Sequence, residues 1–394
     1  MKCFRWLFSL CAVAGVLASY GAADAAAQGC TAQRGCPTIP PSIPGGFSFN
    51  PYSVSAQQDP EQLDVAPDVV DGQYSVSDMY DQSGGPFLQP GQVIWSYQWN
   101  YSDADRIFLH NDHLPDMDAM VNLVSIQNEH VIGAEIGIAE RLSFVYELPF
   151  QYNNRALDLD AMTGGRLTGR LIQKNGGMAD SRMYLRYWTG CCEDHNLSVY
   201  AGVKVPTGVE DSGDFYQGEF LYDDISIQTG TGSWDPLLGF FAYRRTGYVT
   251  WFGSFNYRIS PASTTNALAL DPLLMDPNST IRNSVTDQLS ADVGFNFALG
   301  QWMLDERGCC NTLWNGLTAT FAVVEAAVPS NDIINDSQGY RRAFNALFVR
   351  PGFIWNPRAD TSIYGNFPVT VDRNLEVPGS FPDISFSFGW IQRW

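Results

Sequence analysis

The feature that most constrains the fold of this chain is a period-two alternation of apolar and polar side chains, which recurs from Gly91 to the last residue. Every second side chain is aliphatic or aromatic in residues 142–150, 289–297 and 384–390. Successive side chains of a β-strand point to opposite faces. The pattern therefore predicts strands with one apolar, aromatic face and one small or polar face.

Turn residues divide the alternating region into twelve predicted strands. They cover residues 91–102, 129–139, 141–153, 179–189, 196–207, 233–245, 247–259, 286–299, 312–326, 342–355, 360–372 and 382–394. The connections after even-numbered strands are mostly short, and those after odd-numbered strands are mostly longer. We therefore predict an all-β fold, a transmembrane antiparallel β-barrel of about 12 strands with short periplasmic turns and longer extracellular loops.

Composition favours a membrane barrel over a soluble sandwich. Hydrophobic residues make up 45% of the chain and aromatic residues 13%, whereas charged residues make up only 16%. A soluble domain usually carries about 25% charged residues. No apolar run after the first residues reaches the ~20 residues of a helical span. The last residue is Trp394. Outer-membrane barrels typically end on an aromatic residue that the barrel-assembly machinery recognises, and the chain resembles them in this respect. The bacterial outer membrane and its lipid are thus the predicted surroundings.

Two segments precede the predicted barrel, which covers residues 91–394. Residues 1–25 combine a basic start at Lys2 and Arg5 with a short apolar stretch and small residues, which is the pattern of a cleaved signal peptide. Residues 26–90 are rich in proline, glycine and serine, and we expect a periplasmic N-terminal segment or a plug.

Charge excludes one class of partner and leaves two readings of the loops open. The formal net charge of −19 argues against nucleic acid, whose binding depends on neutralising phosphates. The acidic loops either hold divalent cations or stay solvated. His110 and His113, among several aspartates, lack a defined ligand spacing, so we predict no metal and no cofactor. None of the four histidines stands beside a serine in a recognisable motif, and we predict neither an enzyme nor catalytic residues.

The alternation also predicts which polar side chains point into the barrel, because ionisable groups that face lipid are costly. These are Glu135, Glu147, Asp180, Arg182, Tyr184, Arg186, Lys204, Asp235, Asn256, Arg258, Asp292 and Asp372. Acids and bases are mixed among them. They form either a salt-bridge network that closes a narrow barrel or a wall that contacts a selected ion or ligand.

Six cysteines follow the predicted leader in an exported, oxidising setting: Cys30, Cys36, Cys191, Cys192, Cys309 and Cys310. All six fall in the N-terminal segment or in predicted periplasmic turns. We expect disulfides that tie the segment to the rim of the barrel, with the connectivity open. Metal or haem binding is the alternative, although no C-x-x-C spacing supports it.

Two sequence motifs resemble those of a known family. Residues 204–208 read Lys-Val-Pro-Thr-Gly, and residues 230–239 read Gly-Thr-Gly-Ser-Trp-Asp-Pro-Leu-Leu-Gly. Residues 178–182 are similar to the family's Gly-Asp strand start, with Ala179 where glycine is usual. The chain resembles the meta-pathway phenol-degradation type of outer-membrane proteins over about residues 90–394. The resemblance implies passage of aromatic or other hydrophobic small molecules.

Two functions remain open at this level. The first is an outer-membrane channel for passive passage of small hydrophobic or aromatic solutes, which Phe108, Leu109, Leu114, Met117 and Met120 of the first long loop would contact. Packing of that loop on itself is the other reading of these five residues. The second function is a structural or anchoring barrel with an occluded lumen, whose N-terminal segment contacts a periplasmic partner.

Overall fold

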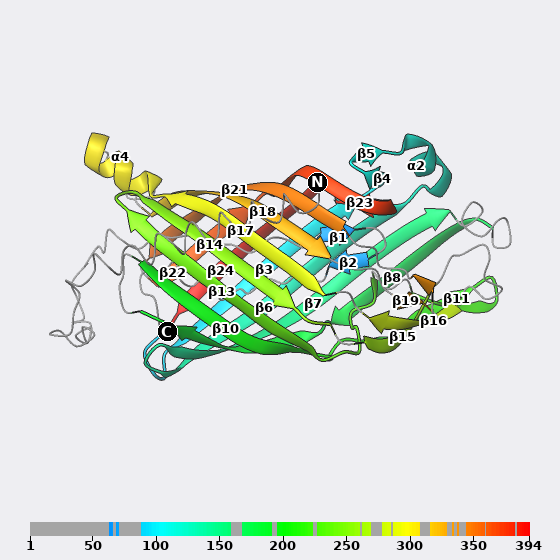
Figure 1. Ribbon diagram of the computed structural model, residues 1–394, viewed down its shortest axis with the longest axis horizontal. Coiled ribbons are helices and arrows are strands. Elements are labelled where there is room, and N and C mark those ends of the chain that lie inside the picture. Colours follow the sequence, from blue (N-terminus) through cyan, green and yellow to red (C-terminus); the bar gives the residue numbers. More distant parts are fainter. Residues whose placement is uncertain are drawn as a thin grey trace.

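The chain forms a closed antiparallel β-barrel of 12 strands, and the predicted fold class is confirmed (Figure 1). This is a computed structural model. It describes residues 63–65, 68–70, 88–158, 168–190, 195–223, 227–260, 262–268, 278–284, 287–307, 316–328, 333–334, 337–338, 344–358, 360–382 and 384–394.

The wall strands follow one another in chain order around the barrel. They are β3 (Val93–Ala104), β6 (Val124–Ala139), β7 (Leu142–Asp158), β9 (Ser181–Trp188), β10 (His195–Val205), β13 (Asp235–Thr246), β14 (Val249–Arg258), β17 (Gln288–Phe297), β18 (Leu317–Val328), β21 (Phe344–Arg358), a strand in two parts, β22 (Thr361–Asn366) and β23 (Val369–Phe381), and β24 (Ile384–Arg393). The last strand pairs with the first, from Ile384 opposite Asp103 to Arg393 opposite Ile94, and this pairing closes the ring.

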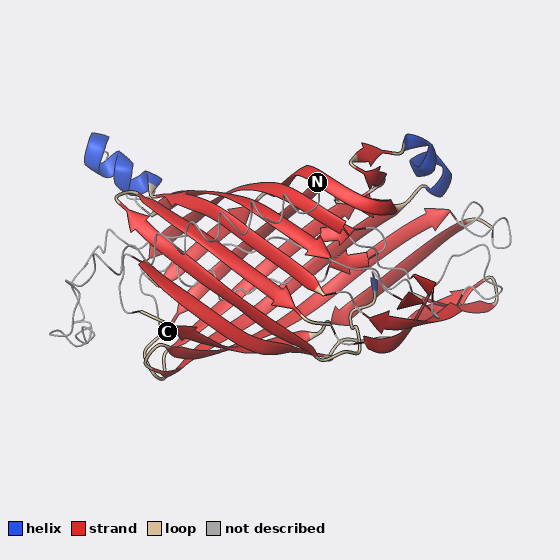
Figure 2. Cartoon of the chain, in the orientation of Figure 1, coloured by secondary structure: helices blue, strands red, loops and turns tan. Residues whose placement is uncertain are grey.

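Smaller elements lie at the two ends of the barrel (Figure 2). At the end with long loops are β4 (Arg106–His110), β5 (Asp112–His113), α2 (Pro115–Val121), β8 (Arg170–Met178), β11 (Gly213–Tyr216), β12 (Glu219–Tyr222), β15 (Ala262–Leu268), β16 (Asn278–Ser284), β19 (Ile333–Ile334) and β20 (Ser337–Gln338). At the end with short turns is α4 (Leu299–Arg307), in a connection predicted as a plain turn. The hairpin of β1 (Leu63–Val65) and β2 (Asp68–Val70) lies near β3 and β23.

The two faces of the wall differ sharply in polarity. On β3, Trp95 is 47% exposed and the adjacent Ser96 is 2% exposed, and the same alternation runs along β6 and β7. The Tyr364 hydroxyl on β22 donates to Oε1 of Gln98 on β3 at 3.2 Å, although β24 stands between these two strands. Side chains that meet across an intervening strand must point into the barrel. The buried polar face is therefore the inner one.

The eleventh wall strand departs from the predicted strand at 360–372. It breaks at Phe367 and Pro368, and its second part continues to Phe381. Within β23 the register shifts, because Leu347 of β21 lies opposite Asp372 while the next residue, Phe348, lies opposite Thr370. Val371 is thus the extra residue of a β-bulge, which changes the face on which the following side chains lie.

None of the helices in the described part of the chain is long and apolar enough to cross a membrane.

The outer face generates a first prediction. Leu185 of β9 is 48% exposed on that face, between the buried Tyr184 and Arg186. An arginine that faces lipid near the bilayer centre costs about 2–4 kcal/mol. We expect Leu185→Arg to lower the free energy of unfolding by about that amount, measured by urea titration of the barrel in lipid with heat-shifted gel mobility as the readout. Leu185→Ala is the control and should lose less; equal losses in the two variants would contradict a lipid-facing wall.

Candidate functional site: the barrel interior

The interior of the barrel has a charged side and an apolar side. Ionisable side chains gather on the inner faces of β6, β7, β9, β10, β13 and β14. Aromatic and aliphatic side chains gather on the inner faces of β18, β21 and β23 and on the inner faces of β9, β13 and β14 near the short-turn end. We describe the charged side first.

Arg182 organises the first group of charges. Its Nη2 lies 3.8 Å from Oε1 of Glu129, and its Nη1 lies 3.5 Å from Oε2 of Glu147. The Tyr184 hydroxyl donates to Oε1 of Glu147 at 3.0 Å. Farther along β9, toward the short-turn end, the Arg186 Nη1 lies 3.6 Å from Oε2 of Glu135. These side chains are buried, so each charge is balanced by protein groups rather than by bulk water.

Lys204 is the centre of a second group, which we call the Lys204 cluster: Asp180, Lys204, Asp235 and Arg258. The Lys204 Nζ lies 2.9 Å from Asp180 Oδ2 and 3.0 Å from Asp235 Oδ2. The Arg258 Nε lies 3.6 Å from the same Asp235 oxygen. The four residues lie at the long-loop ends of β9, β10, β13 and β14, which are consecutive in the wall, and Lys204 is directly opposite Asp235 in the register. All four are buried.

The two family-like motifs meet at this cluster. Asp180 accepts hydrogen bonds from the backbone N–H groups of Gly208 and Thr231, each at 3.0 Å. The Thr207 hydroxyl donates to the Ala179 carbonyl at 2.7 Å and accepts from the Ser181 N–H at 2.8 Å. The Pro-Thr-Gly turn and the start of β13 are therefore anchored to the residues that precede β9.

Glycine is favoured at position 232 because its φ is +68°, which side-chain-bearing residues rarely adopt. The neighbour that a Cβ would meet there is the carboxylate of Glu210. Glu210 lies in the connection between β10 and β11, at the long-loop end. Partial burial, then the negative charges of Asp211 and Asp180, raise the pKa of the Glu210 carboxyl. The loop thus holds an excess of acid next to the Lys204 cluster.

A third charged pair crosses the apolar side. The Arg350 Nη2 on β21 lies 2.8 Å from Asp292 Oδ2 on β17, and β18 stands between these strands. The Ser254 hydroxyl donates to the other Asp292 oxygen at 2.5 Å. The pair passes over β18 where the inward residues are Ala322 and Val324, which lie opposite Arg350 and Asp292 in the register. Small side chains at these two positions leave room for the guanidinium.

The predicted inward residues can now be placed. Glu135, Glu147, Asp180, Arg182, Tyr184, Arg186, Lys204, Asp235, Asn256, Arg258 and Asp292 are all buried, and the ion pairs above join most of them. The prediction for Asp372 is wrong. It lies opposite Leu347, on the other face from the buried Ala346 and Phe348, because the bulge at Val371 reverses the alternation.

Sequence reasoning missed two members of the network, Glu129 and Arg350. Glu129 has the same parity as Glu135 in a predicted strand, so the alternation carried the signal for it. Arg350 lies within the predicted strand 342–355, and its burial beside Asp292 is apparent only from the register of β18 with β21.

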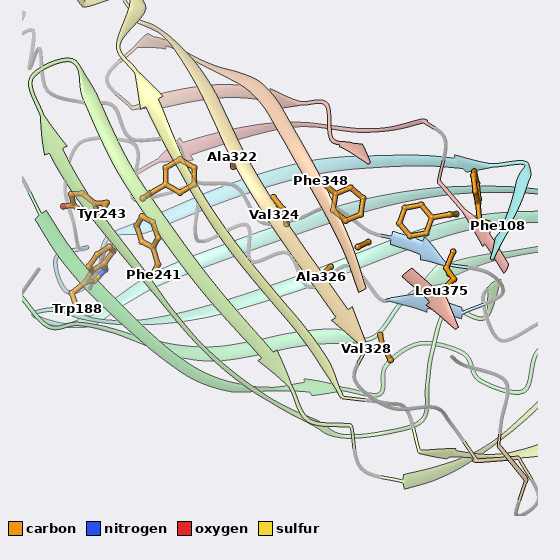
Figure 3. Packing of buried hydrophobic residues seen from close by; sticks show 13 residues of the cluster. Phe108, Trp188, Phe241, Tyr243, Ala322, Val324, Ala326, Val328, Phe348 and Leu375 are labelled. Carbon is orange, nitrogen blue, oxygen red and sulfur yellow. The ribbon is translucent and has the colours of Figure 1, made fainter. Parts of the chain in front are cut away.

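The apolar side is a continuous cluster that we call the apolar track (Figure 3). Its 13 buried residues are Phe108, Trp188, Phe241, Tyr243, Phe252, Ala322, Val324, Ala326, Val328, Ala346, Phe348, Leu375 and Phe381. Trp188, Phe241 and Tyr243 pack edge-on or stacked near the short-turn end, with ring centroids 5.8–6.3 Å apart. Phe108 and Leu375 lie at the opposite end, so the track follows the length of the barrel.

The wall is interrupted close to the long-loop end of the track. Strand pairing between β22 and β24 ends with Asn366 opposite Ser387. On that side of β23, the described pairs resume only at Leu375, opposite His110 of β4. The Phe367 N–H points to β21, where it donates to the Pro351 carbonyl at 3.0 Å. Consecutive N–H groups of a strand point to opposite sides, so Pro368 lacks the donor that would face β24.

The remaining predicted sites are the cysteines and the acidic and histidine-containing loops. The six cysteines Cys30, Cys36, Cys191, Cys192, Cys309 and Cys310 lie outside the described residues, and the disulfide hypothesis stays a prediction. Within the described ranges, no group of three or more histidine, cysteine, aspartate or glutamate side chains could hold a metal ion. His113 contacts the Asp118 carboxylate in the first long loop.

Comparisons with known proteins bear on the fold. No protein family and no curated protein matches the chain. Among solved structures, an outer membrane channel from Pseudomonas putida F1 is 10% identical, covers 78% of this chain and 97% of its own, and has a TM-score of 0.50. The toluene transporter TodX from Pseudomonas putida is 9% identical, with 79% and 91% coverage and a TM-score of 0.39. The translocator domain of the autotransporter NalP from Neisseria meningitidis is 9% identical, with 80% and 92% coverage and a TM-score of 0.39. The first of these supports the barrel fold alone, and the resemblance to the phenol-degradation type stays a prediction.

The Lys204 cluster yields a second prediction. Removing one partner of a buried ion pair leaves the other charge without a partner and lowers the free energy of unfolding by about 3–5 kcal/mol. We expect Lys204→Met to lower the free energy of unfolding by that order, because Asp180 and Asp235 lose their shared cation. The other lysine of the described residues, Lys174, is exposed, so Lys174→Met should change stability by less than about 0.5 kcal/mol. Urea titration in lipid measures both, and similar values for the two variants would contradict the assigned role of Lys204.

Proposed function

We propose that this protein is a bacterial outer-membrane channel through which small hydrophobic solutes pass passively. The observation that carries the proposal is the apolar track. A lumen lined throughout by fixed ion pairs would offer an apolar solute no contact, whereas this lumen holds a buried apolar strip along its length, which the Arg350–Asp292 pair crosses at Ala322 and Val324. The exposed apolar outer face and the shared fold with an outer membrane channel are consistent with the location.

The charged side explains why the proposed solute is apolar rather than ionic. The acids of the network already have protein cations as partners, within 2.8–3.8 Å. An incoming ion would have to displace these partners, and leaving a buried charge uncompensated is expensive. The network therefore acts as a rigid, electrostatically satisfied wall, and passage is left to the apolar side.

The wall interruption suggests the outer end of the route. The long-loop end of the track, at Phe108, Leu375 and Phe381, lies on or beside β23, and the pairing of the preceding part of this strand, β22, with β24 ends before Pro368. We propose that the long loops face the cell exterior, as they do in other outer-membrane barrels. Solutes would then exchange between the track and the surroundings near the interruption, where backbone pairing does not seal the wall.

Aromatic compounds are the narrower substrate class that we propose. The ends of the track are rich in rings: Trp188, Phe241 and Tyr243 at one end, and Phe348 and Phe381, stacked with centroids 5.9 Å apart, at the other. Aromatic rings attract one another beyond simple area burial. The motifs at residues 204–208 and 230–239, with their resemblance to the phenol-degradation type, support the same class.

A second candidate function is a barrel with an occluded lumen. It is favoured by the β1–β2 hairpin, which lies near both β3 and β23. In that case residues 26–90 would block the track and present a surface to a periplasmic partner.

A third prediction tests the track itself. Ala326→Asn places an amide on the track, whereas Thr320→Asn places the same amide on the same inner face of β18 outside it. An amide that faces an apolar solute without a hydrogen-bond partner costs about 1–3 kcal/mol. We expect Ala326→Asn to reduce the uptake of a small apolar compound by roughly tenfold, and Thr320→Asn to leave it near the wild-type rate.

The measurement is uptake by intact bacterial cells that lack other hydrophobic-solute channels, with a sugar of similar mass as the second substrate. Heat-shifted mobility confirms that each variant is folded. Equal uptake of the apolar compound and the sugar by the unmodified protein would indicate a general pore and contradict the proposal.

A fourth prediction separates the two candidate functions. Deleting residues 26–87 leaves the wall strands intact, since β3 begins at Val93. If the protein is a channel, the deletion should change the uptake of the apolar compound by less than about threefold. The occluded barrel predicts that uptake is near zero before the deletion and rises steeply after it.

A further inference from the structure

The strongest unassigned feature of the interior is a guanidinium packed between two aromatic rings. The Arg373 Cζ lies 3.5 Å from the ring centroid of Phe108 and 5.3 Å from that of Phe381. Both rings are buried members of the apolar track, at its long-loop end. At 3.5 Å the guanidinium is in direct contact with the Phe108 ring, a favourable cation–π position.

The bulge at Val371 turns the Arg373 side chain toward the interior. Val369 and Val371 are exposed on the outer face of β23, and strict alternation would place residue 373 there as well. Beyond the bulge, Arg373 lies opposite Ala346, whose side chain is buried in the track. The register shift thus points a cation into an apolar strip, next to the Phe108 and Phe381 rings. Bulges often re-aim a side chain for a purpose of this kind.

Phe108 reaches the site from a separate piece of chain. It belongs to β4 in the loop after β3, and its strand pairs with β23 on one side and with β5 on the other. The loop is held to β23 by Asn111, whose Oδ1 accepts from the Arg373 N–H at 3.2 Å and whose Nδ2 donates to Asp372 Oδ1 at 3.0 Å. Phe108 is therefore a ring supplied by a loop, docked against a cation that belongs to the wall.

We infer that the Arg373 guanidinium and Phe381, on which Phe348 stacks, form a binding site for the ring of a small aromatic solute, and that Phe108 occupies this site when no solute is present. The inference rests on the proposed function and narrows it. The neighbouring residues explain the preference: Phe348 and Phe381 offer ring faces, Leu375 offers apolar contact, and the guanidinium rewards a π face that a saturated ring lacks.

Binding at this site exchanges one ring for another. The solute ring takes the place of Phe108 over Arg373, so the guanidinium keeps an aromatic partner throughout and is never exposed to bare hydrocarbon. An alicyclic solute of the same size would displace Phe108 without replacing the cation–π contact. Discrimination between aromatic and saturated rings follows from this difference alone.

The test compares toluene with methylcyclohexane, which share carbon number and approximate shape. Binding of each is measured to the full-length barrel in lipid nanodiscs, in excess of empty nanodiscs. We expect the unmodified protein to bind toluene more tightly, by about three- to tenfold, and Arg373→Leu to abolish that preference. Arg170→Leu, at an exposed ion pair with Asp158, is the matched control and should retain it.

A second variant changes affinity in the opposite direction. Phe108→Leu keeps apolar bulk in the loop but removes the competing ring, so toluene should bind more tightly than to the unmodified protein, again by about three- to tenfold. The inference is overturned if Arg373→Leu keeps the aromatic preference or if Phe108→Leu weakens toluene binding. Because binding is measured without transport, a barrel that binds toluene selectively but fails the cellular uptake assay refutes the channel function and leaves the aromatic site standing.

Discussion

The structure depends on the need of every backbone N–H and C=O group in a membrane wall to find a partner within the protein. Lipid offers none, so an open sheet edge is costly and the sheet must close on itself. The pairing of β24 with β3 over its whole length provides that closure. Closure then fixes the rest: each strand has one face toward lipid and one toward a narrow lumen. The alternation of Trp95 with Ser96 is a direct result.

A closed ring of this size brings inward side chains into contact across neighbouring strands, and this explains how the polar face is satisfied. Glu147 and Arg182 lie opposite one another in the register of β7 with β9, and Lys204 and Asp235 do so in that of β10 with β13. Acids and bases on adjacent strands at equal height neutralise each other at the lowest cost in desolvation. The apolar track occupies inner faces between and beyond these pairs: β9, β13 and β14 contribute to it only near the short-turn end, away from the Lys204 cluster.

The sequence was sufficient to predict the strands to within a few residues in most cases, because the strand pattern has a period of two. Eleven of the twelve polar side chains expected to point inward are buried in the structure. Asp372 failed for a physical reason: one bulged residue, Val371, reverses parity, and nothing in the composition of residues 369–375 marks it. Pro368 was visible, but its effect depends on which neighbour its missing N–H would face, and only the register supplies that. Contacts between distant segments, such as Arg373 with Phe108, lie beyond any local pattern.

The interruption beside β23 follows from the same requirement that closes the barrel. A wall that loses pairing at Pro368 exposes polar backbone unless another group supplies partners, and here the side chain of Asn111 does so for the Arg373 N–H. The loop that carries Asn111 also carries Phe108, so a single segment both satisfies the backbone at the break and fills the end of the apolar track. Moving that loop would uncover both at once. The break in pairing is tolerable because the loop supplies a partner there. In the channel that we propose, this loop would be the part that moves aside, because its displacement leaves the ring of twelve strands intact.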